Sequence, residues 1–566
     1  MILYALDISS AAQGIVNVRM EFPIDGKCDI VMPVWTPGSY SVRDFSRHVF
    51  DLKSSGTMIQ ASKNVWSIES KESRVEVKYS VFCDELSVQT SYANDEFLLL
   101  NGAGIFFYVE RRKDERCKVR LENVNRKRVA TGLKGDNYEY SAENYDQLAD
   151  SPFLIGNFKN MEFQVMGKRH VVAWQGLMPI GSEKISSDFQ KIVEEEAKIF
   201  GELPYEEYFF LIVSVPDELY GGLEHKNSTA ILTNGNKLAE ETFYKLFLTT
   251  VSHEFFHTWN VKRIRPRELG PFDYTKEVYT NLLWLSEGFT SYYEWLVLWR
   301  AGIVSEEEYF KHISTMIQYY LLQPGHLYPA DLSSFNTWIK LYKPDGNILN
   351  SYVSYYLKGE LIAFVLNCYI LKETGGSKSL DDLFRMLYSH FVDNGEGIDK
   401  GELIEYVSKV SGKDSKDFLS SLTESNEEID FAKYLDAIGY SLKMNKRENP
   451  SPGFLGLVLT SEKGKIVVRA SLKGHPAFKA GILPGDELVA INGQRFIELF
   501  TREISPEIRN LKLDDLKWIR PEEEVSVHLF RNNRLISLNA RAGKEPPTIS
   551  VEKKEENNLK EKMLRG

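Results

Sequence analysis

The sequence is poor in cysteine, has no long hydrophobic run and has no excess of positive charge. Its four cysteines are scattered without the paired spacing of a disulfide framework or a cysteine zinc site, so we expect buried thiols. No stretch approaches the roughly 18 uninterrupted apolar residues of a membrane-spanning helix. The opening residues, MILYALDISS, lack the basic region of a secretory signal. We therefore expect a cytoplasmic protein that does not bind membranes.

The charge balance argues against nucleic-acid binding. The 566 residues include 80 acidic and 69 basic side chains, which gives a net charge of −11. Nucleic-acid binders need a basic face that displaces counterions from phosphates. Hydrophobic residues make up 43% of the chain and charged residues 26%, the composition of a folded globular protein. The length predicts roughly two to four domains.

Four segments with different patterning divide the chain. Residues 1–165 alternate apolar and polar positions in short runs, which predicts an all-β domain. Residues 166–445 open with a helix and a buried strand and then keep mostly helical spacing. Residues 450–543 return to short strands joined by Gly and Pro turns, and residues 544–566 are polar, which predicts a flexible charged tail. The expected fold class is multidomain α+β.

The strongest chemical signal is the pentapeptide HEFFH at residues 253–257. It lies in an uninterrupted run of helical period, so His253 and His257 fall on one helix face and can share a metal ion. Zinc suits neutral imidazole nitrogen, and the carboxylate of Glu254 can reach a metal-bound water as a general base. The alternative at this point is a helix with two partly exposed histidines and no metal.

Glu287 is the candidate third ligand. It lies in the run NLLWLSEGFTSYYEW, also of helical period, beside a glycine and among apolar and aromatic residues. A carboxylate in such surroundings is either fully paired or bound to a metal, because an unpaired buried charge is too costly. The 29 residues between His257 and Glu287 are enough for a loop and a returning helix. Two histidines and one glutamate leave a fourth position for water, as in catalytic zinc sites.

Two further segments contain candidate substrate contacts. In YGGLEHKNS, Gly221 and Gly222 allow a close backbone approach, and Glu224 offers a carboxylate to a substrate amino group. An ordinary turn with a solvated glutamate fits this local sequence equally well. In SYVSYYLKGEL, Tyr355 and Tyr356 open a helical run, where a tyrosine either donates to an oxyanion or simply packs.

These segments together resemble a known family. HEFFHTWNVKRIRP, WLSEGFTSYYE, YGGLEHKNS and YYLKGEL are similar to the glycyl aminopeptidase family of zinc metallopeptidases, which are gluzincins with a thermolysin-like catalytic domain. The early segment VWTPGSYSVRDFSRHV resembles the N-terminal β domain of that family, and GFLGLVL with VVRASLKGHPAFKAGILPGDELVAINGQ resembles a PDZ domain. The resemblance implies an N-terminal domain at 1–165, a peptidase domain at 166–445 and a PDZ-like domain at 450–543.

The resemblance also implies roles for the zinc-site residues. His253, His257 and Glu287 would hold one Zn²⁺ per chain. Glu254 would activate the zinc-bound water and carry its proton. The expected activity is hydrolysis of N-terminal residues from peptides, with a preference for small residues such as Gly or Ala.

The substrate contacts follow from the same resemblance. Glu224 would bind the α-amine of the peptide. The next residue is His225, where the wider aminopeptidase N family has Asn, so the detailed amine contacts differ. Tyr356, which precedes Leu-Lys-Gly, would donate to the oxyanion, and Tyr355 is the alternative donor.

Two other functions stay open at this point. One is a zinc endopeptidase in which Glu224 binds no amine. The other is a non-catalytic scaffold whose PDZ-like module binds peptides. In that module, the backbone N–H groups of residues 454–457, which include Gly456, can bind the C-terminus of a peptide that pairs with the next strand. The alternative is that the module only packs against the catalytic domain.

Overall fold

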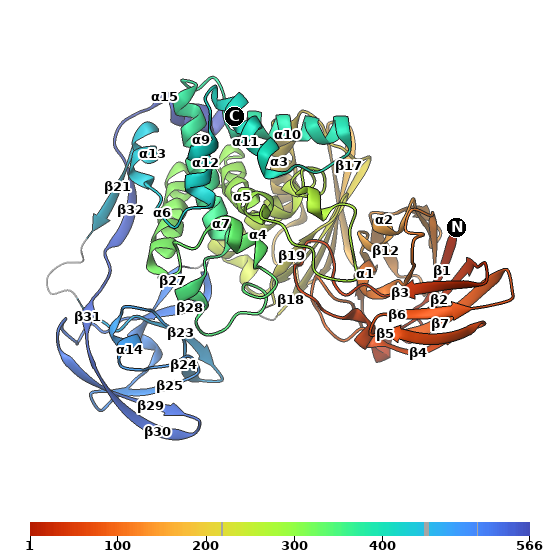
Figure 1. Cartoon of the computed structure of the whole chain (residues 1–566), viewed down its shortest axis with the longest axis horizontal. Coiled ribbons are helices and arrows are strands. Elements are labelled where there is room, and N and C mark those ends of the chain that lie inside the picture. Colours follow the sequence, from red (N-terminus) through yellow and green to blue (C-terminus); the bar gives the residue numbers. More distant parts are fainter. Residues whose placement is uncertain (217–218, 446–451, 506–507, 566) are drawn as a thin grey trace. The chain divides into compact units, whose positions relative to one another are not determined.

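The computed structural model describes residues 1–216, 219–445, 452–505 and 508–565 (Figure 1). Contacts divide the chain into two compact units. The first comprises residues 1–279, 293–303 and 384–399, and the second comprises residues 280–292, 304–383 and 400–566. The predicted domain start at residue 450 lies outside the described residues.

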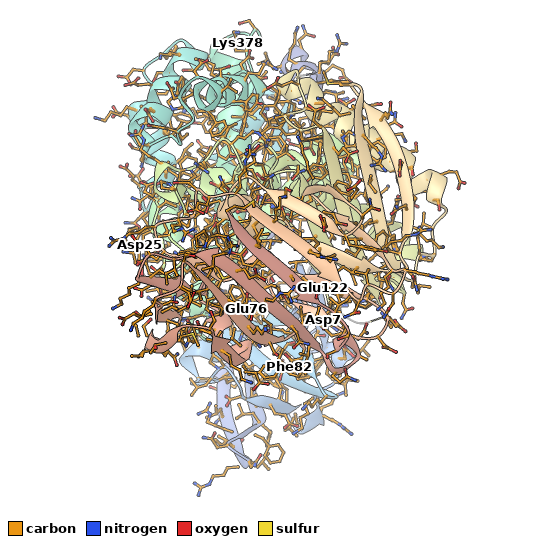
Figure 2. All side chains as sticks on the ribbon, turned by 90° about the vertical axis from the view of Figure 1, so that its right-hand side faces the viewer. Asp7, Asp25, Glu76, Phe82, Glu122 and Lys378 are labelled. Atoms are coloured by element: carbon orange, nitrogen blue, oxygen red, sulfur yellow. The ribbon has the colours of Figure 1, made fainter. Side chains whose placement is uncertain are left out.

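The first unit begins with a seven-stranded sheet built from alternating apolar and polar residues. In β2 every second side chain is buried, as the period of a strand with one core face requires. The strand order is β13-β14-β11-β1-β2-β7-β4, and the pair β1 and β11 is parallel. Figure 2 looks onto this sheet, with Asp7 and Glu122 paired at the ends of β1 and β11. Its strands are β1 (Ile2–Asp7), β2 (Ile15–Pro23), β4 (Val49–Ser54), β7 (Arg74–Phe82), β11 (Cys117–Glu122), β13 (Lys134–Asp136) and β14 (Glu139–Ala142).

Two four-stranded sheets complete the N-terminal β domain. They have the orders β10-β3-β6-β5 and β12-β15-β9-β8. The first contains β3 (Lys27–Val31), β5 (Thr57–Ser62), β6 (Val65–Glu69) and β10 (Tyr108–Val109). The second contains β8 (Tyr92–Ala93), β9 (Leu98–Leu100), β12 (Arg128–Thr131) and β15 (Phe153–Gly156). One large apolar core lies beneath these strands, and short helices α1 (Gly102–Ile105) and α2 (Tyr145–Ala149) border it. The predicted all-β N-terminal domain is confirmed.

A five-stranded sheet with two long helices follows in the same unit. The sheet has the order β16-β17-β18-β20-β19, in which β17, β18 and β20 run parallel and β19 is an antiparallel edge strand. Its strands are β16 (Lys159–Val165), β17 (Lys168–Gly176), β18 (Glu207–Val215), β19 (Gly221–Glu224) and β20 (Ser228–Asn234). The helices α3 (Ser182–Phe200) and α4 (Glu241–Phe256) each contact this sheet. Strand β18 is the buried strand that the sequence predicts.

Helices form the part of the second unit that precedes residue 440. They include α6 (Glu306–Leu322), α7 (Ala330–Phe335), α8 (Ile348–Ser351), α9 (Tyr355–Glu373), α11 (Lys400–Ser411), α12 (Lys416–Thr423) and α13 (Phe431–Ala437). A π-helical turn, Trp284–Gly288, leads into α5 (Phe289–Arg300) and packs on α9. Two glycines make this packing close, since a Cβ atom on Gly288 would lie 2.4 Å from the Cα of Gly359. Helix α10 spans Leu380–Asn394.

A β domain follows the helices in the second unit, as predicted. Its main sheet has the order β27-β28-β23-β24-β25-β29-β30, with β26 paired to β25. The strands are β23 (Leu457–Glu462), β24 (Lys465–Ser471), β25 (Glu487–Ile491), β26 (Gln494–Arg495), β27 (Thr501–Ser505), β28 (Ile508–Asp514), β29 (Glu524–Arg531) and β30 (Arg534–Arg541). A short helix, α14, spans Pro476–Lys479. Leu322 and Leu349 of the helical part pack against an apolar cluster of this domain, so the domain does contact the helices.

The predicted flexible tail at 544–566 is wrong. After β31 (Gly543–Lys544), the chain forms β32 (Thr548–Lys553) and α15 (Asn558–Arg565), and β32 pairs with β21 (Tyr440–Asn445). The average polarity of the tail hides a strand in which Ile549 is buried and a helix in which Met563 is buried. The backbone N–H of Val551 donates to Ser314 Oγ over 2.8 Å, which ties β32 to α6.

The described helices give no candidate for crossing a bilayer, because each is too short or too polar.

Candidate active site

The two histidines of HEFFH lie together at the end of α4. His253 lies in the last turn of the helix, and His257 is the residue at which the helix ends. Their rings are 4.6 Å apart between centroids and nearly perpendicular. Both side chains are buried, so the alternative of two partly exposed histidines does not describe this helix.

A hydrogen bond at Nδ1 orients each imidazole ring. Nδ1 of His253 lies 2.8 Å from Oε2 of Glu294 on α5, and Nδ1 of His257 lies 2.5 Å from the backbone carbonyl oxygen of Asn260. A carbonyl only accepts, so Nδ1 of His257 is the donor, and the carboxylate favours the same assignment at His253. Nε2 of each ring then carries the lone pair that a metal ion requires.

Glu287 lies in the π-helical turn and is buried. Ligand atoms of His253, His257 and Glu287 lie within 4.8 Å of one another. The sequence predicts a regular helix here, whereas the turn has the wider π geometry that is common at functional sites. Trp284 anchors the turn by donating from Nε1 to Asp331 over 2.9 Å. Two oriented imidazoles and one carboxylate fit zinc and leave a fourth position for water.

Glu254 and Gly222 of β19 lie close together in the first unit. A Cβ atom on Gly222 would lie 2.1 Å from Oε1 of Glu254, so only glycine leaves room for that carboxylate. A Cβ atom on Gly221 would meet only Val88, at an ordinary 3.7 Å. The close approach predicted for the two glycines therefore occurs at Gly222. Glu224, Glu254 and His257 also form a cluster whose ligand atoms lie within 4.8 Å of one another.

Glu224 is buried rather than solvated. Its side chain is 3% exposed, and Oε1 has no hydrogen-bond partner among the described residues. A Cβ atom on Gly38 would lie 2.5 Å from both carboxylate oxygens, and Gly38 has a φ of +89°, which favours glycine. The cavity left here measures about 10 Å³ and is also lined by Trp35 and Tyr40. The solvated turn considered for Glu224 is therefore wrong.

The loop that carries Trp35, Gly38 and Tyr40 was not expected to contribute to the site. It belongs to the N-terminal β domain, and its sequence WTPGSY predicts only a turn. The Pro-Gly pair is the signal for this turn, but it does not predict which residue the turn contacts. The contact with Glu224 spans almost two hundred residues of sequence, and no local pattern encodes it.

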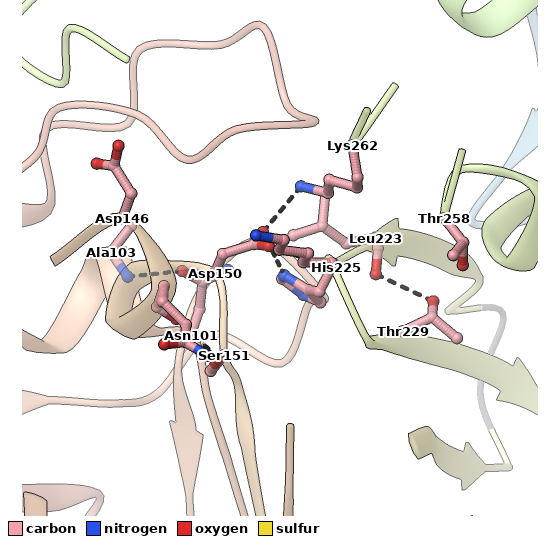
Figure 3. Close-up of polar contacts among 12 residues, drawn as sticks. Asn101, Ala103, Asp146, Asp150, Ser151, Leu223, His225, Thr229, Thr258 and Lys262 are labelled. Carbon is pink, nitrogen blue, oxygen red and sulfur yellow. Dashed lines mark hydrogen bonds and ion pairs between the residues drawn. The ribbon is translucent and has the colours of Figure 1, made fainter. Parts of the chain in front are cut away.

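Asp150 binds the two residues that follow β19, His225 and Lys226 (Figure 3). Its carboxylate accepts from Lys262 Nζ over 2.8 Å, from His225 Nδ1 over 3.1 Å and from the backbone N–H of Lys226 over 2.8 Å. Burial alone would raise the pKa of Asp150, but Lys262 and His225 outweigh it and hold that pKa below its ordinary value. His225 is thus engaged by a carboxylate of the N-terminal domain.

The two tyrosines at the start of α9 differ in their surroundings. Tyr355 is fully buried, and its ring stacks on Tyr356 at 4.7 Å between centroids. The hydroxyl of Tyr356 lies 3.5 Å from that of Tyr342. Burial and the nearby charge of Glu287 raise the pKa of Tyr356 well above its ordinary value, so its hydroxyl keeps the proton that it can donate.

Three parts of the chain match models of known protein families. Residues 246–362 match the model of the M61 glycyl aminopeptidase family, residues 3–157 match the M61 N-terminal domain, and residues 443–513 match a PDZ domain. The matched family is one of peptidases, so the chain is an enzyme of the hydrolase class. No curated protein matches the sequence.

Solved structures include a similar chain of the same architecture. An aminopeptidase N family protein from Idiomarina loihiensis superposes with a TM-score of 0.91 at 28% identity, over 100% of this chain and 99% of that chain. An M1 zinc metallopeptidase from Deinococcus radiodurans has a TM-score of 0.47 at 12% identity, over 76% of this chain and 94% of that chain.

Proposed function

We propose, from the premise that this chain has the N-terminal and catalytic domains of the M61 glycyl aminopeptidase family, that it is a zinc aminopeptidase acting on peptides. The observation that carries this proposal is the proximity of His253, His257 and Glu287, whose ligand atoms lie within 4.8 Å. The buried carboxylates of Glu254, for water activation, and Glu224, for amine binding, lie close to His257.

His253, His257 and Glu287 would hold one zinc ion per chain. When bound, that ion polarises a scissile carbonyl and lowers the pKa of a coordinated water. The chain prepares the ligands in advance, because Glu294 and the Asn260 carbonyl fix the histidine rings. Fixed rings lose little freedom when they bind a metal, which favours affinity.

Glu254 would act as general base and proton carrier. It takes the proton of the attacking water and delivers it to the nitrogen of the departing peptide, so its carboxylate is unchanged after one turnover. Gly222 supports this role, because a side chain there would occupy the position of the Glu254 carboxylate.

Glu224 would bind the protonated α-amine of the substrate. Oε1 of Glu224 has no hydrogen-bond partner among the described residues, and a buried acceptor without a donor is costly. An ammonium group supplies both the charge and the N–H donors. The similarity to the glycyl aminopeptidase family supports a small first residue such as Gly or Ala.

Tyr356 would donate its hydroxyl to the oxyanion that forms on the scissile carbonyl. Its closeness to Glu287 supports this assignment over Tyr355, whose ring lies deeper in the core. One donor of this kind contributes on the order of 3 kcal/mol to transition-state stabilisation.

The proposal is tested by measuring zinc content and peptidase activity of Glu254→Gln beside the control Glu241→Gln, an exposed residue of the same helix. We expect one zinc per chain in both variants and an activity loss of about 100-fold or more in Glu254→Gln alone. Wild-type activity in Glu254→Gln, or a chain that binds no zinc, would reject the peptidase mechanism and favour the scaffold.

A second comparison separates an aminopeptidase from an endopeptidase. Peptides with a free amino terminus are compared with the same peptides after N-acetylation. An aminopeptidase loses activity when the amine is blocked, whereas an endopeptidase does not. Equal rates would remove Glu224 from the proposed role while leaving the zinc chemistry in place.

A further inference from the structure

In the PDZ domain, the backbone N–H groups of the loop that leads into β23 donate hydrogen bonds to a side-chain carboxylate. Asp514 accepts from the N–H of Leu455 over 2.7 Å, of Gly456 over 3.1 Å and of Leu457 over 2.8 Å. These donors are the ones that the sequence marks as a receptor for the C-terminus of a peptide. Three consecutive N–H groups directed at one carboxylate form an anion-binding nest.

The strand that ends in Asp514 also occupies the edge of β23. Strand β28 pairs antiparallel with β23, with Val458 opposite Leu513 and Leu459 opposite Lys512. A peptide that binds by strand addition makes the same two contacts, since its backbone pairs with a sheet edge and its terminal carboxylate enters a backbone nest. The segment 511–514 therefore has the geometry of a bound ligand.

The side chains around this segment are packed as at a filled site. Leu513 lies in an apolar cluster with Phe454, Val458 and Leu472. Asp514 is 1% exposed, and burial raises its pKa to about 6 although the N–H groups of Leu455 and Leu457 oppose that shift. The carboxylate is thus ionised at neutral pH, where its charge strengthens the hydrogen bonds that it accepts.

Gly456 allows the loop to present its N–H groups in this way. It has a φ of +79°, and a Cβ atom on it would lie 2.3 Å from Cβ of His475. The loop is therefore held in its carboxylate-binding conformation by packing as well as by Asp514.

We propose that the segment 511–514 is an internal ligand of the PDZ domain, and that Asp514 fills the site at which the C-terminal carboxylate of a peptide would bind. The full chain at rest does not recruit peptides by their C-termini. The backbone nest binds a carboxylate, and in this chain that carboxylate is the side chain of Asp514. This inference rests on the PDZ domain and is independent of the zinc chemistry.

The first test uses Asp514→Gly in the full chain, with Asp515→Ala as the control at the neighbouring carboxylate. Hydrogen exchange of the peptide that contains residues 455–457 is measured with and without formate, at pH 7.5 and at constant ionic strength. We expect exchange on the order of tenfold faster in Asp514→Gly, since hydrogen bonds to a charged acceptor are lost. Formate should restore slow exchange in that variant, because it fits the vacated nest. Asp515→Ala should behave like the wild type.

The outcomes of this test are decisive in both directions. Equal exchange in Asp514→Gly and wild type, or a formate effect of the same size in both, would overturn the proposal. If Asp514→Gly loses the near-ultraviolet signal of the folded domain, Asp514→Asn replaces it. That variant keeps the shape of the side chain and removes the charge, and its exchange should again exceed that of wild type.

The second test asks whether the wild-type site is closed. The probe is a fluorescent peptide, Arg-Asn-Leu-Lys-Leu-β-alanine, whose terminal carboxylate has the position of the Asp514 side-chain carboxylate in the chain. The same peptide with a C-terminal amide is the control. We expect wild type to show no difference between the two peptides. Saturable binding of the carboxylate form alone, with protection of residues 455–457, would overturn the internal-ligand proposal.

Discussion

Oε2 of Glu294 lies 2.8 Å from Nδ1 of His253, so a carboxylate on α5 fixes one ring of the histidine pair at the end of α4. The two residues are 41 positions apart in sequence. A carboxylate that accepts from the far nitrogen of an imidazole sets its tautomer and increases its basicity toward a metal.

Replacing Glu294 should weaken zinc binding without abolishing it. We expect Glu294→Ala to lower zinc affinity by about 10- to 100-fold, because the ring of His253 loses its orientation and part of its basicity. Glu294→Gln keeps an acceptor and should lie between Ala and wild type. Competition with a chelator of known affinity measures the change. Equal affinities in all three chains would show that this carboxylate does not tune a metal ligand.

Gly222→Ala should damage activity, whereas Gly221→Ala should not. The added methyl at position 222 would collide with Oε1 of Glu254, and the methyl at 221 meets Val88 at an ordinary distance. We expect kcat to fall by about 100-fold in Gly222→Ala with zinc retained, since the base is displaced. The kcat and the zinc content of both variants are measured to check this. Matching losses in both variants would point to a general effect on β19.

The tyrosine pair gives a second matched comparison. Tyr356→Phe should lower kcat by roughly 100-fold or more with little change in KM, because an oxyanion donor acts mainly in the transition state. Tyr355→Phe should retain most of the activity. If the losses are reversed, Tyr355 is the donor, and if neither variant is impaired, the oxyanion is stabilised without a tyrosine.

Asp150 should make stability depend on pH in the acidic range. Its folded-state pKa is held below the ordinary value, so its contribution is complete above the unfolded-state pKa of about 4. That contribution is lost as the pH falls through the lower folded-state pKa. At pH 7 we expect Asp150→Asn to lower the free energy of unfolding by about 3 kcal/mol, because Lys262 stays buried without its charge partner.

Denaturant unfolding of wild type and Asp150→Asn at several pH values measures this effect. The difference between the two chains should shrink below about pH 4. Glu206→Gln, at an exposed ion pair with Lys168, is the control and should leave stability unchanged. A pH-independent difference would mean that the carboxylate acts through packing and not through its charge.

The sequence predicts the elements whose signals are local. Alternation gives the strands of the N-terminal domain, and helical spacing places the HEFFH histidines on one helix. The partners that complete the site escape such patterns. Glu294, Asp150 and Gly38 come from other elements and meet their partners only in the folded chain.

The incorrect tail prediction has a different cause. Composition averaged over residues 544–566 is polar, so the sequence predicts that the entropy of ordering outweighs burial. The structure needs only a few apolar side chains there, because β32 gains backbone hydrogen bonds from β21 and a side-chain acceptor, Ser314 Oγ, from α6. A short strand that completes an existing pair is favourable where an isolated strand is not.

The pairing of β21 with β32 means that the PDZ domain is an insertion and not a C-terminal appendage. The chain leaves at Asn445 and returns at Thr548, and these residues lie opposite each other in the pair. Both ends of the module therefore meet within about one strand spacing. In evolutionary terms, recombination can add, remove or exchange this module in one step. The helical part of the unit stays intact, because its last strand, β32, and its last helix, α15, follow the module.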